Sequence, residues 1–319
     1  MTTVIVILAC AAILTLVAAY ICFHMTFYVP DKSRPDPEEI QVPDGSIYVP
    51  YHGLMRRWAR EARAMPQRHA YITSHDGLRL HARFFEFAPG AAVEIMFHGY
   101  RGTAERDLSG GVQRCFSLGR SVLLVDQRAA GDSEGRVISF GINESRDCRG
   151  WVDWLIADQG EDVKIILTGI SMGASTVMIA AGRPLPPQVV GVIADCGFTS
   201  ARDIIFTVMR RIKMPPKLCY PFVKLGARIF GHFDLEETTA AEAMKNCRLP
   251  VFFIHGEDDR FVPCAMSRQC YENCAAPKYL FTVPAAGHGM GYLLDTDGYR
   301  RELTKFSREN GIPIENYWE

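Results

Sequence analysis

The sequence predicts an α/β protein with one large domain built on a mostly parallel sheet. Short apolar stretches rich in β-branched residues recur along the chain, and segments with helical spacing separate most of them. Continuous apolar strands are typical of a parallel sheet that helices cover on both faces. With 319 residues, 48% of them hydrophobic and 22% charged, the chain is long enough for one such domain with a sizeable core.

The expected elements follow one another in a regular order. A helix at 51–65 would place apolar residues on one side and arginines around the other. The stretches 69–74 and 78–87 predict a hairpin, and a longer helix is expected at 143–158. The remaining strands are expected at 93–97, 122–126, 163–167, 189–194, 251–254 and 279–283.

Residues 1–30 predict an N-terminal membrane anchor. Val4 to Phe23 contains no charge, and 20 helical residues extend roughly 30 Å, the hydrocarbon thickness of a bilayer. A cleaved signal peptide is the alternative, but no basic segment precedes the apolar run. Lys and Arg occur only after the run, which favours a single-pass protein with its main domain in the cytoplasm. The ten scattered cysteines, expected as free thiols in a reducing compartment, agree with this orientation.

Two further segments have distinct compositions. Residues 31–50, rich in proline and acids, predict an extended linker to the domain at 51–319. Residues 199–233 exceed the one crossover helix needed before the penultimate strand and predict a helical lid that selects substrates. The lid has seven basic residues and one acid, a net charge of +6 in a chain whose net charge is −1. It is expected to face a membrane, with a solvent-facing lid as the alternative.

The stretch Val163–Ile179 carries the pattern that predicts the chemistry. An apolar strand leads into Gly169–Ile170–Ser171–Met172–Gly173, and small residues then lead into a helix. In that context G-x-S-x-G forms a nucleophile elbow, so Ser171 is the candidate nucleophile. The same pattern recurs around Ser133, but acids fill both variable positions and no small-residue helix follows. We expect Ser133 in a loop.

A serine hydroxyl needs a base to take its proton. His288 lies in a Gly-flanked loop after the last expected strand, from which an imidazole can reach back over the elbow. His98 and His255 end strands and are expected to have structural roles. The other histidines are expected at the surface, namely His24, His52, His69, His75, His81 and His232.

These motifs resemble the α/β-hydrolase superfamily, in particular its esterase and monoglyceride-lipase-like branch, over roughly residues 70–306. His255–Pro263 matches the family pattern H-G-x-x-D-x-x-V-P, which implies that Asp259 orients His288. Asp195, after the preceding strand, and Asp258 are the alternatives. His98–Gly99–Tyr100 matches H-G-x, which implies an oxyanion hole formed by the backbone of Tyr100 and of Met172. Ala129 stands where relatives often carry glycine.

The sequence therefore predicts a membrane-anchored serine hydrolase that cleaves a carboxylic ester, more lipid-like than sugar-borne, through an acyl-enzyme intermediate. Acyl transfer, thioester cleavage or peptide-bond cleavage by the same residues is an alternative, as is a non-catalytic binding scaffold. No Cys/His cluster has the spacing of a metal site, so neither a metal nor a cofactor is expected. The near-zero net charge gives no reason to expect a nucleic-acid partner.

Overall fold

An eight-stranded sheet forms the centre of the computed structural model, which describes residues 1–30 and 39–315. The strand order is β1-β2-β4-β3-β5-β6-β7-β8. β1 and β2 are antiparallel to their neighbours, and the strands from β4 to β8 run parallel. The prediction of a mostly parallel sheet is confirmed. The strands are β1 (Arg68–Thr73), β2 (Arg79–Phe85), β3 (Val93–Phe97), β4 (Ser121–Asp126), β5 (Ile165–Ile170), β6 (Val189–Asp195), β7 (Val251–Gly256) and β8 (Lys278–Val283).

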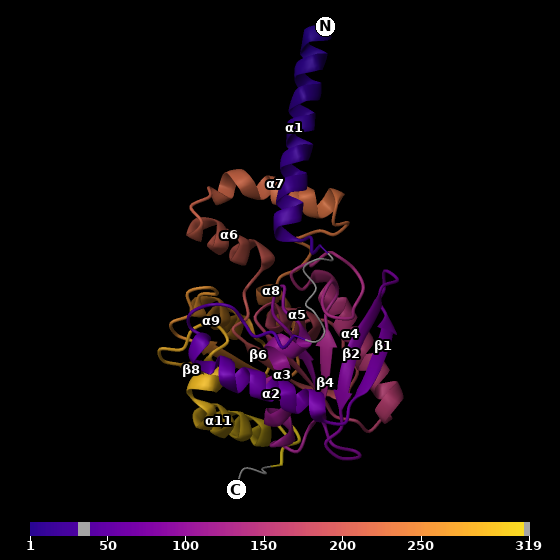
Figure 1. The fold of residues 1–319 in the computed structure, drawn as a ribbon, viewed down its shortest axis with the longest axis vertical. Helices are drawn as coiled ribbons and strands as arrows, with labels where there is room; N and C mark the ends of the chain where they lie inside the picture. The colour runs from indigo at the N-terminus through magenta and orange to yellow at the C-terminus, as the bar shows by residue number, and fades with distance from the viewer. Residues whose placement is uncertain (31–38, 316–319) are drawn as a thin grey trace.

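Helices cover both faces of the sheet (Figure 1). One apolar cluster joins the sheet to α4, α5, α8 and α9, and two others join its opposite face to α2, α3 and α11. The helices are α1 (Thr2–Thr26), α2 (His52–Ala64), α3 (Ala104–Phe116), α4 (Ile142–Gln159), α5 (Met172–Ala181), α6 (Ala201–Arg211), α7 (Pro216–Ile229), α8 (Ala240–Asn246), α9 (Cys264–Asn273), α10 (Gly291–Leu294) and α11 (Thr296–Glu309). The predicted lid corresponds to α6 and α7, inserted before the penultimate strand.

A charged group lies within the otherwise apolar strand β3. Glu94 is fully buried and receives hydrogen bonds from Arg114 and Arg120, the latter at 2.6 Å. Burial alone would raise the pKa of this carboxyl, but the two guanidinium groups lower it to about 2. Glu94 therefore remains ionised and ties α3 to the sheet.

The N-terminal helix α1 has an exposed part and a packed part. Side chains from Val4 to Val17 are exposed, and within the described residues α1 is the one helix long and apolar enough to cross a membrane. Further along, Ala19 and Phe23 are buried against α7. A Cβ atom on Gly226 of α7 would lie 2.5 Å from the Ala19 carbonyl oxygen, so glycine permits the close crossing visible in Figure 1.

The end of α1 is also bonded to the domain. The Tyr100 hydroxyl donates to the carbonyl oxygen of Thr26 at 2.8 Å, and Arg101 donates to those of Met25 and Tyr28 at 3.1 Å. Phe27 is fully buried beneath the lid. The sequence predicts residues 1–30 as an anchor that a linker separates from the domain. In the structure, these residues contribute aromatic side chains to the core of the domain.

The predicted linker at 31–50 differs from the expectation where it is described. Residues 31–38 lie outside the described residues. Beyond them, Gly45 (φ +120°) permits a turn closed by a 3.0 Å hydrogen bond from the Tyr48 N–H, and the short 3₁₀ helix η2 (Val49–Tyr51) follows. The apolar Ile47 and Tyr48 pack against the last strand's loop, which folds the segment onto the domain.

Two local expectations need correction. The strand expected at 163–167 begins at Ile165 and continues to Ile170, directly before the elbow. His81, expected at the surface, is 1% exposed because it lies within the sheet, on β2 between β1 and β4. Its Nδ1 lies 2.9 Å from a carboxylate oxygen of Asp126, so the buried ring has a polar partner.

Phe27→Ala should destabilise the protein by about 3–5 kcal/mol, the usual cost of truncating a buried phenylalanine. The variant loses packing against Phe140 and Phe233, whose ring centroids lie 5.8 and 5.3 Å away. Thermal unfolding of the full chain in detergent measures the change. Leu14→Ala, on the same helix but 70% exposed, is the matched control and should unfold with the wild type. Equal unfolding temperatures for all three proteins would contradict the packed role of Phe27.

Candidate active site

Ser171 lies on a strained turn between β5 and α5. Its φ of 56° and ψ of −117° are unfavourable for a residue with a side chain, and its N–H donates to the Asp195 carbonyl oxygen at 2.8 Å. A Cβ atom on Gly169 would lie 2.2 Å from the Gly173 backbone, and one on Gly173 would lie 2.0 Å from the Phe97 carbonyl oxygen. Gly169 therefore permits β5 and the first turn of α5 to approach closely, and Gly173 permits α5 to approach the end of β3.

The structure brings Ser171, His288 and Asp259 into one hydrogen-bonded chain. His288 Nε2 lies 2.9 Å from Ser171 Oγ, and its Nδ1 lies 2.6 Å from Asp259 Oδ2. With a proton on Nδ1, the imidazole donates to Asp259 and accepts from the serine hydroxyl. The three groups come from the ends of β5, β7 and β8, which meet at the carboxyl edge of the sheet.

Asp259 is buried and surrounded by donors. Its Oδ1 accepts the N–H groups of Phe261 and Val262 at 2.8 and 2.9 Å, and its Oδ2 lies 3.1 Å from His255 Nε2. Burial alone would raise the pKa of this carboxyl, but hydrogen bonds with His255 and His288 hold it well below its usual range. Asp259 thus remains a carboxylate across the neutral pH range. His255, predicted to have a structural role, helps to keep this carboxylate ionised through its hydrogen bond.

The two alternative acids occupy different positions. Asp258 is exposed. Asp195 ends β6 and lies at the wall of the cavity beside Ser171, where its Oδ1 is buried without a hydrogen-bond partner among the described residues. Burial raises the pKa of the Asp195 carboxyl to about 6.

Two backbone segments lie where an oxyanion hole is expected. Met172 is the first residue of α5, so its N–H has no carbonyl partner one turn earlier and lies at the positive end of the helix. The loop after β3 passes close to Ser171, since a Cβ on Gly99 would lie 3.6 Å from that of Ser171. Tyr100 follows in this loop, with its side chain packed on Phe140 and bonded to α1.

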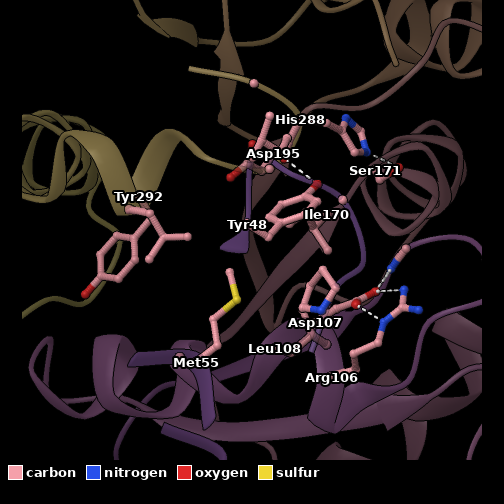
Figure 2. A pocket seen from close by; sticks show the side chains of 18 of the residues that line it. Tyr48, Met55, Arg106, Asp107, Leu108, Ile170, Ser171, Asp195, His288 and Tyr292 are labelled. Carbon is pink, nitrogen blue, oxygen red and sulfur yellow. Dashed lines mark hydrogen bonds and ion pairs between the residues drawn. The ribbon is translucent and has the colours of Figure 1, made fainter. Parts of the chain in front are cut away.

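A cavity of about 780 Å³ opens beside these groups (Figure 2). It lies on the sheet face covered by α2 and α3, and many of its lining side chains are apolar or aromatic, including Met55, Trp58, Met96, Leu108, Ile170 and Tyr292. Residues 43–48 also line it, although their sequence predicts part of a linker. The aromatic and apolar side chains within that proline-rich stretch were the sequence feature that could have indicated contact with the domain. Of the lid residues 199–233, all described, Arg211 lines the cavity, so the lid supplies less of its wall than expected.

Ser133 and His98 occupy supporting positions. The buried Ser133 donates to the Asp126 carbonyl oxygen at 2.6 Å and accepts the His81 N–H at 2.8 Å. The buried His98 accepts the Gln127 N–H at 3.1 Å. These bonds hold the loops after β3 and β4.

Two groups of side chains in the described part of the chain have potential metal ligands within 4.8 Å of one another. One comprises Cys196, Asp259 and His288, and therefore overlaps the serine–histidine–aspartate chain. The other comprises His81, Asp126 and Asp132, in which the histidine and Asp126 already form a hydrogen bond. Neither arrangement requires a metal to satisfy its buried members.

Comparison with known proteins identifies the family. The model of the alpha/beta hydrolase family matches residues 95–301, well over half of the chain. The chain belongs to this family. It is 27% identical over 190 residues to the uncharacterized protein YqkD of Bacillus subtilis, covering 59% of this chain and 62% of that protein. It is 28% identical over 209 residues to the lysophosphatidylserine lipase ABHD12 of Mus musculus, covering 61% and 48%. The match thus spans less than two thirds of the length of either relative.

Solved structures support the same fold. An esterase of Pyrococcus furiosus superposes with a TM-score of 0.63 at 20% identity, covering 78% of this chain and 93% of that chain. Est1E of Butyrivibrio proteoclasticus, solved with ferulic acid bound, gives 0.58 at 20% identity, with 76% and 98% covered. This structural likeness confirms the alpha/beta hydrolase fold of the chain.

Asp195→Asn should stabilise the protein at pH 8 and leave its stability unchanged at pH 4. The folded-state pKa of about 6 exceeds the unfolded value of about 3.9. Folding therefore favours the protonated acid, and stability is lost as the pH rises through about 6. Asparagine carries no charge at either pH, which removes this penalty. Melting temperatures at both pH values test the effect, with the exposed Asp258→Asn as control; a stabilisation equal at both pH values would refute the explanation.

Proposed function

We propose that this alpha/beta hydrolase is a serine hydrolase that cleaves carboxylic esters, with Ser171 as nucleophile, His288 as general base and Asp259 as the acid that orients it. The observation that carries the proposal is the hydrogen-bonded chain of 2.9 and 2.6 Å between these residues, with the serine on a strained turn beside a cavity. A nucleophile, an oriented base and a shaped cavity are the components that acyl transfer to water requires.

The proposed reaction has two stages. Ser171 Oγ attacks the ester carbonyl while its proton passes to His288 Nε2, and Asp259 stabilises the imidazolium through Nδ1–H. The N–H groups of Met172 and Tyr100 bind the negative oxygen of the tetrahedral intermediate. His288 then returns the proton to the leaving alcohol, which leaves an acyl group on the serine. Water, deprotonated by the same imidazole, releases the carboxylic acid and restores Ser171.

The lining of the cavity favours lipid-like esters. Methionine, leucine, isoleucine and aromatic side chains surround much of the space beside Ser171, and such side chains bind acyl chains well. The similarity to a lysophosphatidylserine lipase supports the same substrate class. Thioester or peptide-bond cleavage and acyl transfer use the same groups and would appear as a different preference in a substrate series.

We also propose that α1 anchors the protein in a membrane with the lid at its surface. The part of α1 before Ala19, where packing on α7 begins, would extend roughly 26 Å, close to the ~30 Å hydrocarbon core. α6 and α7 would then lie at the headgroup level (Figure 1). Absence of basic residues before the apolar run and their presence after it favour the cytoplasm for the domain.

The surface of the lid fits this position. Three large apolar side chains of the lid, Ile212, Leu218 and Ile229, are exposed by 55, 67 and 39%. Exposed basic residues flank them, namely Arg210, Arg211, Lys213, Lys217 and Arg228. Apolar side chains can enter the interface, and each basic residue adds about 1 kcal/mol of attraction to anionic lipid.

Ser171→Ala should abolish ester hydrolysis and labelling by a fluorophosphonate probe, because among the described residues no other hydroxyl is hydrogen-bonded to the His288 imidazole. Removal of a triad nucleophile typically lowers kcat by several orders of magnitude. The assay is hydrolysis of p-nitrophenyl esters of increasing chain length by the full chain in detergent. Ser133→Ala, which alters the second G-x-S-x-G, should retain labelling. Labelling that survives in Ser171→Ala but is lost in Ser133→Ala would overturn the assignment.

Trypsin should cleave the lid more slowly in anionic than in neutral nanodiscs, because anionic headgroups would cover Arg210, Arg211, Lys213 and Lys217. High salt should reduce the difference, since it screens the attraction. Mass spectrometry of timed digests of the full chain gives the rate at each site. Arg301 on α11, whose side chain is 68% exposed at the end of the molecule opposite the lid, is the control and should be cleaved equally in both. Equal rates of lid cleavage in both bilayers, unchanged by salt, would contradict the proposal.

A further inference from the structure

The loop that carries His288 contains two residues with positive φ. Gly289 has φ +65° and Ala285 has φ 58°, and His288 has a glycine on each side. Such a loop loses much conformational entropy when it adopts one geometry. The imidazole must nevertheless keep two hydrogen bonds at once, to Ser171 and to Asp259. A further contact that holds the backbone would stabilise that geometry.

Residues 43–51, here called the strap, provide such a contact. The Tyr48 hydroxyl donates to the carbonyl oxygen of His288 itself at 2.7 Å, a bond visible in Figure 2. Ile47 lies against Gly287, where a Cβ atom would approach its Cδ1 to 3.0 Å. Tyr48 and Tyr51 also pack on the apolar cluster beneath this loop, which contains Val283, Ala286 and Met290.

The chemistry of the Tyr48 hydroxyl suits a permanent donor. Burial, with the acids and thiol nearby, raises the pKa of Tyr48 well above its usual range. The hydroxyl therefore keeps its proton throughout the pH range in which a histidine titrates. A phenylalanine at this position would fill the same space and pack on the same cluster, but it would leave the His288 carbonyl without this donor.

We propose that Tyr48 is a positioning residue for the hydrolase reaction, whose hydroxyl fixes the His288 backbone so that the imidazole meets Ser171 and Asp259 together. The inference rests on the proposed function of these three residues. It extends the active site to a segment that precedes the sheet in the sequence and lies 240 residues from the histidine it holds.

The test compares Tyr48→Phe with Tyr51→Phe in the full chain in detergent. Tyr51 belongs to the same apolar cluster. Loss of one neutral hydrogen bond is worth ~1 kcal/mol, so Tyr48→Phe should lower kcat for a short soluble ester about five-fold. KM should remain within about two-fold of the wild type, and fluorophosphonate labelling should slow by the same factor as kcat. Tyr51→Phe should match the wild type in all three measurements.

The pH profile separates positioning from a merely structural role. A less ordered imidazole loses part of its interaction with Asp259, which stabilises the protonated ring. The acid limb of kcat/KM for Tyr48→Phe should therefore move to lower pH. A reduced kcat with an unmoved limb and a lowered melting temperature would assign Tyr48 a structural role and overturn the proposal. Unchanged kcat and labelling would overturn it as well.

A parallel measurement on Ser171→Ala distinguishes failure of the positioning role of Tyr48 from failure of the proposed function. If Ser171→Ala is inactive and unlabelled while Tyr48→Phe behaves like the wild type, only the positioning role of Tyr48 fails. If Ser171→Ala retains hydrolysis and labelling, the proposed function fails and the inference about Tyr48 fails with it.

Discussion

The site depends on the close approach of β5 and α5 around one strained residue. Ser171 adopts its unfavourable backbone conformation because Gly169 and Gly173 leave no side chains between the strand, the helix and the neighbouring loop. The contact at Gly173 brings the end of β3 against the start of α5, so the loop containing Gly99 lies beside the serine. These two glycines, which have no Cβ atom, therefore determine how Ser171, the amide of Met172 and the loop through Tyr100 are arranged.

The histidine and its acid rely on a different kind of support. Asp259 is held by two backbone N–H groups and by His255, so its position does not depend on His288. His288 instead lies in a loop with glycine on both sides and takes its geometry from partners on other segments. In the proposed mechanism, a rigid acid hydrogen-bonded to a base on a more adaptable loop would let the imidazole accept and return a proton with little movement of the carboxylate.

Local patterns made the sheet and the residues around Ser171 predictable, because apolar runs and glycine turns act over a few neighbouring residues. Contacts between distant segments were not predictable in this way. The bond from Tyr48 to His288, the burial of His81 and the packing of Phe27 beneath the lid all join residues far apart in the sequence. Ala129 is informative in a different sense. Its φ of 64° lies in the left-handed region that favours glycine, whereas the sequence alone showed only the departure from the expected motif.

The crossing of α1 and α7 at Gly226 has a mechanical consequence. A helix joined to a domain by a flexible tether can tilt freely to match the thickness of the surrounding bilayer. Here the lower turns of α1 are packed and hydrogen-bonded, so tilting would require α7 and the loop of Tyr100 to move as well. If α1 spans a membrane as proposed, a mismatch between the length of the helix and the bilayer would act directly on these elements. Membrane thickness would then influence the framework that holds the candidate active site.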